Sequence, residues 1–255
     1  MSKFLLTFVV KSCPLQLQKL GNSCALIRGA KYSLGTINSR YTNFSSELEN
    51  TLQSEKNYES IKKLSKYATR HVKWERQRDQ SDLQYFNYLL LDPRVTNKLA
   101  SRASGMHCID IWFTFLRAIF YVGKGKGIRP YIHFVQAEKL LGKPDNIKQA
   151  KDPKLALMLS IWEHKRGILL LRGFRGISSE DAQTREASMI SALSMNHLTN
   201  RRKGVYFGPA KEKFTPTQRK LLGIALLHKL MGQFIAKEER EIYPQISVDK
   251  AAKAA

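Results

Sequence analysis

Cysteine is scarce in this sequence, and long apolar runs are missing. Cys13, Cys24 and Cys108 are the three cysteines among 255 residues, and they are widely spaced. This spacing excludes a CxxC zinc pair and gives no basis for a disulfide framework, so we expect a reducing compartment. The longest apolar runs, such as FLLTFVV near the amino end, are far too short to cross a bilayer. We therefore expect no membrane span.

Acidic residues are also under-represented. Asp and Glu number 21 against 43 Lys and Arg, which gives a formal net charge of +22. The remaining composition, 43% hydrophobic and 25% charged, is ordinary for a globular protein. Such a positive field favours a polyanion, either nucleic acid or an anionic membrane surface. We expect nucleic acid; the plainer alternative is a solvated basic surface in an RNA-rich compartment.

The first 46 residues contain no acid at all. They hold six Lys or Arg and several Ser, and the first acidic residue is Glu47. This composition is typical of a mitochondrial transit peptide, so residues 1–46 are expected to target the protein to mitochondria. The alternative is a disordered basic arm that binds nucleic acid, with the nucleus as the location.

Three further segments are expected along the chain. Residues 47–82 are dense in charges of both signs, with apolar residues at helical spacing, and predict an exposed helical linker. Residues 83–243 mix short apolar runs with amphipathic stretches and predict the folded domain. Residues 244–255 predict a flexible tail.

Three apolar runs in the folded domain predict strands: YFNYLLL, AIFYVG and ILLLRGF. Helices are expected in HFVQAEKLLG, in DPKLALMLSIWEHKRG with Gly167 as its stop, and in the segment after Ser178. The last helix has a strong start signal in TPTQ. There Thr215 can cap, Pro216 suits the first helical position, and Gln218 can close a capping box.

Residues 119–134, IFYVGKGKGIRPYIHF, form the most distinctive stretch of the chain. The loop is not a Walker A loop, because the G-x-x-x-x-G-K-S/T spacing is absent, and a glycine-rich turn alone is a weak signal. Arg129 and His133 lie four residues apart. A helix opened by Pro130 would place both on one face, beside the strand end that carries Tyr121. These side chains either converge on one phosphate or decorate a turn.

A carboxylate lies within the apolar stripe of the helix after Ser178. Glu186 shares this stripe with Ala182, Met189, Ile190 and Leu193. An unpaired carboxylate in such a place costs several kcal/mol, so Glu186 needs a counter-charge. Either a buried ion pair with Arg or Lys or a metal ion can supply it.

Four motifs, in this order, resemble the GIY-YIG nuclease superfamily: NYLLLDPRV, YVGKGKGIRPYIHF, TREASMISAL and LTNRRKG. In particular they look like its branch of animal ankyrin-repeat and LEM-domain endonucleases, over about residues 84–208 and the final helix. No ankyrin repeat or LEM segment is visible in the sequence.

The resemblance maps the family's functional positions onto this chain. Tyr121 matches the second signature tyrosine, and Gly123 and Lys124 match the glycine and lysine after it. Arg129 and His133 match the R-x-x-x-H pair. The matches in the later motifs are Glu186 for the metal-binding glutamate and Asn200 for the closing asparagine.

Tyr88 is the candidate for the first signature tyrosine. Here the sequence departs from the family pattern, because the strand reads NYL instead of GIY. In addition, 32 residues separate Tyr88 from Tyr121, where many members have a short hairpin.

The resemblance implies an α+β fold, with a small three-stranded antiparallel sheet flanked by helices and an added C-terminal helix. It also implies an endonuclease that hydrolyses DNA phosphodiester bonds with one divalent cation, Mg²⁺ or Mn²⁺, held by Glu186. Tyr121, or Tyr88 in relay with it, would take a proton from water, and Arg129 would bind the phosphate. His133 would act in the proton relay or position the phosphate.

The expected substrate is duplex or branched DNA, chosen by structure more than by sequence. Its expected contacts are Gly123, Lys124, Lys126, Asn200, Arg201, Arg202 and Lys203, with Asn200 also supporting the site. Lys211, Lys213 and the stretch RHVKWERQR are further candidates for backbone contacts. The alternatives are an inactive nucleic-acid-binding protein that kept the fold and a structural RNA-associated protein of mitochondria.

Overall fold

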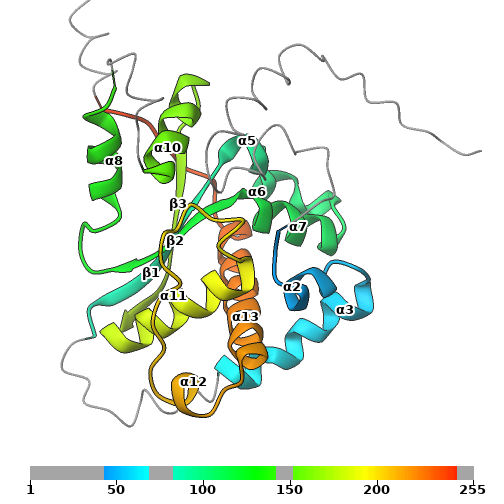
Figure 1. Cartoon of the computed structure of the whole chain (residues 1–255). Helices are drawn as coiled ribbons and strands as arrows, with labels where there is room; N and C mark the ends of the chain where they lie inside the picture. Colours follow the sequence, from blue (N-terminus) through cyan, green and yellow to red (C-terminus); the bar gives the residue numbers. More distant parts are fainter. Residues whose placement is uncertain (1–42, 69–82, 142–151, 246–255) are drawn as a thin grey trace, which may run out of the picture.

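The fold is built on an antiparallel sheet, seen in a computed structural model that describes residues 43–68, 83–141 and 152–245. Its strands are β1 (Tyr85–Leu91), β2 (Ile119–Gly125), β3 (Ile168–Ile177) and β4 (Glu241–Ile242). They lie in the order β2-β1-β3-β4 (Figure 1). The α+β class and the first three strands are confirmed.

The expected count of three strands is wrong, because β4 adds a fourth. The chain returns after its last long helix and pairs Ile242 with Ile168 and Glu241 with Leu169. A strand of two residues is too short to produce an alternating pattern, so no periodic signal predicts it. Gly167 also differs from expectation: the helix before it ends at Glu163, and the Gly167 N–H donates to the Glu241 carboxylate at 2.6 Å.

The helices form most of the remaining described chain. In sequence order they are α2 (Ser46–Asn50), α3 (Glu55–Glu59), η3 (Ser60–Leu64), α5 (Pro93–Thr96), α6 (Leu99–Arg102), η4 (Ala103–Gly105), α7 (Cys108–Ala118), α8 (Tyr131–Glu138), α10 (Pro153–Glu163), α11 (Ser179–Leu193), α12 (Pro209–Glu212) and α13 (Pro216–Ile235). The capping box predicted at Thr215 and Gln218 is confirmed at the start of α13. None of these helices is long and apolar enough to cross a membrane.

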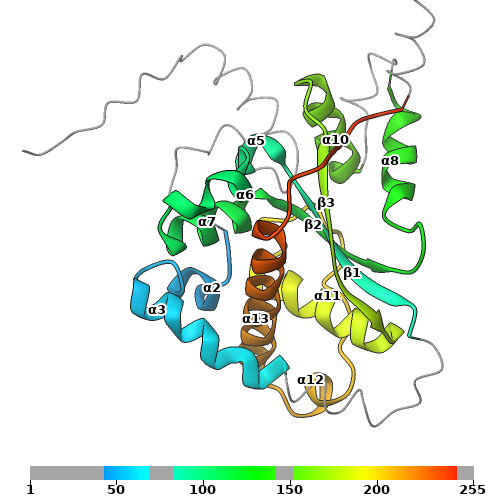
Figure 2. The same ribbon diagram turned by 180° about the vertical axis from the view of Figure 1, so that it is seen from behind.

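Two hydrophobic cores lie on opposite faces of the sheet. Leu89 and Leu91 of β1 join the larger core with α7, α11 and α13, whereas Tyr88 and Leu90 join the smaller core with α8 and α10. Figures 1 and 2 show this division, with α8 and α10 on one side of the sheet and α11 and α13 on the other. Successive side chains of a strand point to opposite faces of the sheet. Since both faces of β1 are covered by a core, its residues are apolar in succession and its sequence is a nearly continuous apolar run.

Part of the expected linker is packed instead of exposed. In residues 43–68 the side chains of Phe44, Leu48, Tyr58, Ile61 and Tyr67 are buried and join the larger core. Polar contacts add to this packing: Lys220 pairs with Glu47 at 2.9 Å, and the Trp112 indole N–H donates to the Thr51 hydroxyl at 2.9 Å. The expectation of an exposed tether is therefore wrong for this stretch. The charges of both signs that suggested it occupy the outer face of the same short helices.

The helices α11 and α13 approach closely behind the sheet. A Cβ at Gly223 of α13 would collide with the backbone of Ser188 and Met189 in α11. The Asn87 side chain on β1 donates to the Ala182 carbonyl at 2.9 Å. The strand and α13 thus hold α11, the helix that carries Glu186, from two sides.

Candidate active site

Tyr88 and Gly123 occupy facing positions on β1 and β2. A Cβ at Gly123 would lie 2.6 Å from the Tyr88 hydroxyl oxygen, so only glycine leaves room for the phenol ring. Tyr121 lies two residues before Gly123 on the same face of β2, diagonally across from Tyr88, and the two ring centroids are 6.1 Å apart. The register of β1 and β2 therefore brings together the two tyrosines despite the long insertion between them.

His133 links this tyrosine pair to a buried lysine. The His133 imidazole on α8 is 6% exposed, and its Nε2 lies 2.9 Å from the Tyr88 hydroxyl. Its Nδ1 lies 2.8 Å from the Nζ of Lys154, in the first turn of α10. The Lys154 ammonium also lies 4.7 Å from the centre of the Tyr121 ring, in cation–π geometry.

Burial dominates the protonation of these groups. It raises the pKa of Tyr88 well above the ordinary tyrosine value. Burial, followed by the Glu186 carboxylate, raises the pKa of Tyr121 to about 12, while a hydrogen bond with Tyr88 and the charge of Arg129 lower it. Burial, Lys154 and Arg129 together lower the pKa of His133 to about 4, so the imidazole is neutral at physiological pH.

Glu186 lies at the free edge of β2. Burial raises the pKa of its carboxyl group to about 7, although the Lys124 charge and a hydrogen bond from the Lys124 backbone both lower it. Neither an Arg nor a Lys within residues 43–68, 83–141 or 152–245 forms an ion pair with this carboxylate. The neighbouring Arg185 pairs with Asp181 instead. The buried ion pair that the sequence left open is therefore not found in the described part of the chain.

Asn200 braces the same edge of β2. Its side-chain oxygen accepts from the Val122 N–H at 3.0 Å, and its side-chain nitrogen donates to the Val122 carbonyl at 2.8 Å. The Thr199 N–H donates to the Phe120 carbonyl at 2.8 Å. Alternate residues of an edge strand direct their backbone N–H and C=O groups away from the neighbouring strand. On β2 these residues include Phe120, Val122 and Lys124, whose backbone groups bond to Thr199, Asn200 and Glu186, respectively. This gives Asn200 a supporting position, with both ends of its amide occupied by the backbone.

Arg129 extends from the loop between β2 and α8. A Cβ at Gly125 would lie 2.6 Å from the Arg129 Cβ, so this glycine lets the arginine fold back over the end of β2. The Arg129 guanidinium is exposed and makes no hydrogen bond or ion pair with any residue that the structure describes. Its charge nevertheless influences the pKa values of Tyr88, Tyr121 and His133, which places it beside all three.

The other expected DNA contacts lie on the surface. Lys124 is half-buried beside Glu186, and Lys126 is exposed at the loop with its Nζ 5.7 Å from the centre of the Tyr85 ring. The exposed cations that follow the bracing asparagine are Arg201, Arg202 and Lys203, with Lys211 and Lys213 further along. The stretch RHVKWERQR lies outside the described residues.

Lys154 is the site residue that the sequence reasoning missed. It stands in DPKLALMLSIWE, where one lysine among apolar residues looks like the solvated side of an ordinary helix. Asp152 caps α10 by accepting from the Lys154 N–H at 3.0 Å, and this cap turns the lysine side chain inward to 7% exposure. A lone cation in the first turn of a predicted helix was the available signal, since cations are unfavourable there.

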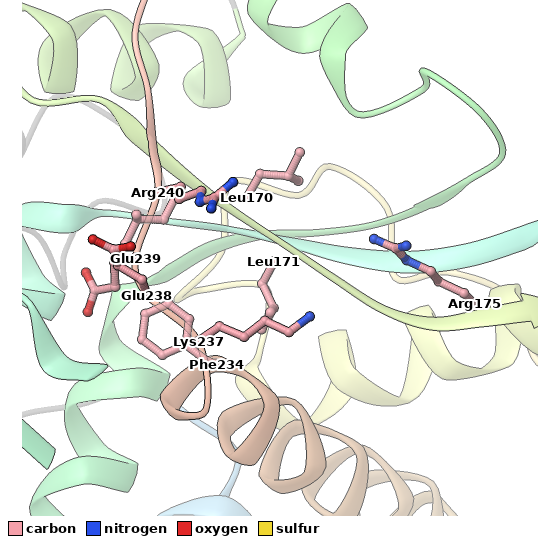
Figure 3. Close-up of a pocket in the computed structure, with 9 residues that line it drawn as sticks. Leu170, Leu171, Arg175, Phe234, Lys237, Glu238, Glu239 and Arg240 are labelled. Atoms are coloured by element: carbon pink, nitrogen blue, oxygen red, sulfur yellow. The ribbon is translucent and has the colours of Figure 1, made fainter. Parts of the chain in front are cut away.

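A cavity lies away from these residues. It has a volume of about 510 Å³ and is lined by Leu169–Leu171 and Arg175 of β3 and by residues from Phe234 to Arg240 (Figure 3). The sheet order places β3 and β4 at the edge opposite to β2.

The donor set at Glu186 fits a hard divalent cation with few protein ligands. Within the described part of the chain no three His, Cys, Asp or Glu side chains gather into a metal cluster. Mg²⁺ commonly keeps several waters and binds one or two carboxylates together with substrate phosphates. A single carboxylate that is half-buried, forms no ion pair with the described residues and lies beside exposed cations meets that requirement when a phosphate completes the shell.

Comparison with known proteins identifies the class of this site. The family model described as the LEM-3-like GIY-YIG domain matches residues 85–248. The chain is 41% identical over 160 residues to the mouse ankyrin repeat and LEM domain-containing protein 1, which covers 63% of this chain and 29% of the relative. Identity to the human protein is 39% over 160 residues, covering 63% of this chain and 26% of the relative. No solved structure matches the chain.

The matched range includes the paired tyrosines, the R-x-x-x-H segment and the glutamate on α11. The chain spans less than a third of the length of the curated relatives it matches, including 17% of the Caenorhabditis elegans homolog. The chain belongs to the family of LEM-3-like GIY-YIG domains. The family resemblance expected from the four motifs is confirmed.

Proposed function

We propose that this protein is a divalent-metal-dependent endonuclease that hydrolyses phosphodiester bonds in DNA, chosen by structure more than by sequence. The main support is the environment of Glu186. A half-buried carboxylate without an ion pair among the described residues lies beside a buried tyrosine, a partly buried one and an exposed arginine. Such an uncompensated acid is costly in a merely structural role and useful in a metal-dependent one.

The residues have distinct roles in the proposed reaction. Mg²⁺ or Mn²⁺ on Glu186 would neutralise charge at the scissile phosphate and its leaving oxygen. Arg129 holds two phosphoryl oxygens through its planar guanidinium. Tyr121, or Tyr88 in relay with it, takes the proton of the attacking water, assisted by the nearby Arg129 charge. Asn200 keeps the β2 edge, and so Glu186 and Tyr121, in register.

The charge distribution supports a DNA substrate held mainly through its backbone. Arg201, Arg202 and Lys203 follow directly on the residue that braces β2, and Lys124 and Lys126 flank the other side of the strand end. Contacts of this kind neutralise phosphates without reading bases, and they weaken steeply with salt.

The test is cleavage of supercoiled, linear and branched DNA by the purified chain in Mg²⁺, with a chelator as the negative arm. We expect Glu186→Gln to abolish cleavage and to leave DNA affinity within about twofold, because the variant keeps the cationic surface. Glu212→Gln, an exposed carboxylate of α12, is the matched control and should cut normally. Cutting by Glu186→Gln at the wild-type rate would remove Glu186 from the mechanism. Binding without cutting by the wild-type chain would favour the inactive nucleic-acid-binding alternative.

We also propose a mitochondrial location, from the composition of residues 1–46. A fluorescent protein fused behind residues 1–45 should accumulate in mitochondria, because a basic, acid-free segment is imported along the membrane potential. A nuclear or diffuse signal would contradict the proposal.

A further inference from the structure

The contacts of His133 are unusual because they fix its tautomer. A charged lysine ammonium has three donors and no acceptor, so the imidazole nitrogen that faces Lys154 must accept. Nδ1 is the nitrogen that lies 2.8 Å from the Lys154 Nζ. Since His133 is neutral, its single ring proton is then on Nε2, which lies 2.9 Å from the Tyr88 hydroxyl oxygen.

The other groups around His133 are compatible with this assignment. Burial lowers the pKa of Lys154. Asp152, 3.8 Å from the Lys154 Nζ, raises this pKa, and the smaller effects of the Arg129 and Arg201 charges lower it. This carboxylate favours the ammonium form. The Gln136 side chain is a further neighbour, and its effect on the pKa of His133 is to raise it, against the larger effects of burial, Lys154 and Arg129.

We propose that Lys154 is a positioning residue that locks His133 in the Nε2–H tautomer, so that His133 donates to the Tyr88 oxygen and the Tyr88 proton is directed towards Tyr121. The proposal rests on the proposed nuclease function for its catalytic meaning, but the tautomer itself does not. The hydrogen bonds then run in one direction, from Lys154 through His133 and Tyr88 to Tyr121.

The direction matters for how a tyrosine loses its proton. With His133 as a donor, negative charge on either phenol oxygen is stabilised by a hydrogen bond. With the opposite tautomer, Nε2 would accept from Tyr88, and Tyr121 would lose its donor. Lys154 contacts neither the phosphate nor the attacking water in this scheme, so its effect passes entirely through His133. Its position resembles that of the outer groups that orient histidine ligands in metal enzymes.

The first experiment reads the tautomer without any reaction. Long-range ¹H–¹⁵N correlation spectra of the metal-free, DNA-free chain separate the Nδ1–H and Nε2–H forms of each histidine. We expect Nε2–H for His133 in the wild type and a shift towards Nδ1–H in Lys154→Met, which has a similar shape and no donor. Nδ1–H in the wild type, or an unchanged Nε2–H signal in the variant, overturns the proposal. If Lys154→Met fails to fold, the wild-type spectrum still decides.

The second experiment measures cleavage. Lys154→Met should lower kcat about 10- to 100-fold with little change in KM, the usual effect of losing an orienting partner. Lys139→Met removes the same charge from the exposed end of α8 and should leave kcat unchanged. In a Tyr88→Phe background Lys154→Met should not lower kcat further, because the hydrogen bond from His133 to the Tyr88 hydroxyl is already lost. Equal rates for the two methionine variants, or a full additional loss in the double variant, overturn the role of Lys154.

Failure of this inference can be distinguished from failure of the proposed function. If the wild-type chain cuts no DNA but shows the Nε2–H tautomer lost in Lys154→Met, the proposed function fails and the positioning by Lys154 stands. If the chain cuts DNA and the His133 tautomer does not depend on Lys154, the proposed function stands and the positioning by Lys154 fails.

Discussion

Tyr88 lies directly across the sheet from Gly123, and its ring fills the space that any side chain at Gly123 would need. The glycine of the YVG motif is thus required by a phenol on the neighbouring strand and not by an unusual backbone angle. The departure of the NYL strand from the family pattern leaves this contact intact. Tyr88, the candidate for the first signature tyrosine, thus faces the glycine of YVG across the two strands.

Gly123→Ala should therefore damage both folding and activity. The new methyl group must displace the Tyr88 ring, and overpacking of this kind costs about 1–3 kcal/mol. Gly232→Ala is the matched control, because a Cβ there meets nothing within 4 Å. It lies within α13 and should raise stability by roughly 0.5–1 kcal/mol. Urea unfolding of the two variants checks the prediction, and an unchanged midpoint for Gly123→Ala would contradict it.

The two tyrosines should behave as one unit. Tyr121→Phe and Tyr88→Phe should each lower kcat by about 100-fold or more, the range of a lost general base. Because the phenols share a hydrogen bond, the double variant should be hardly slower than the slower single variant. Single-turnover cleavage measures all three rates. A double variant whose loss equals the product of the single losses would show that the tyrosines act separately.

Glu186 should make the metal-free protein less stable at higher pH. Burial raises its pKa in the folded protein to about 7, above the ordinary value of 4.5. The native state therefore binds the proton more tightly, and this stabilisation is present below about pH 4.5 and lost as pH rises through about 7. Glu186→Gln lacks this loss and should be more stable than the wild type at pH 8, by roughly 1–3 kcal/mol. The difference in unfolding free energy between wild type and variant, followed from pH 5 to 8, measures it.

His133 is the internal check on that experiment. Its pKa of about 4 is below the ordinary 6.5, so its contribution to the free energy of unfolding falls as the pH drops from about 6.5 to 4. This contribution is the same in the wild type and in Glu186→Gln and therefore cancels in the difference between them.

Mg²⁺ or Mn²⁺ should raise the melting temperature of the wild type at pH 8 and leave that of Glu186→Gln unchanged. Equal metal effects on both proteins would argue for a site elsewhere.

Residues 43–68 should be required for folding, although the family match begins at residue 85. Five buried apolar side chains of this stretch belong to the larger core. Losing them would remove roughly 5–10 kcal/mol, comparable to the whole stability of an ordinary domain. A chain that starts at residue 83 should aggregate or melt without cooperativity, and one that starts at residue 43 should melt cooperatively. As a milder probe, Leu48→Ala in the full chain should cost about 2–5 kcal/mol.

The elements that the sequence predicted correctly are those with strong local patterns. The continuous apolar run of β1 and the capping box of α13 are each specified by neighbouring residues. The packing of residues 43–68 was missed because their charged outer face masked a few well-spaced apolar residues. Lys154 was missed for a different reason: its partner His133 lies on another helix, 21 residues away, and nothing local to α10 reveals that meeting. Glu186 could be singled out from the sequence because a carboxylate in an apolar stripe conflicts with its own surroundings.

Gly223 sets how closely two helices approach each other. It allows α13 to touch the backbone of α11 at Ser188 and Met189, two and three residues beyond Glu186. A single added methyl group there would act as a wedge and tilt the Glu186 carboxylate relative to the tyrosines without contacting either. The spacing of the two helices would then change the geometry of the candidate site, while every residue of the family's motifs stayed in place.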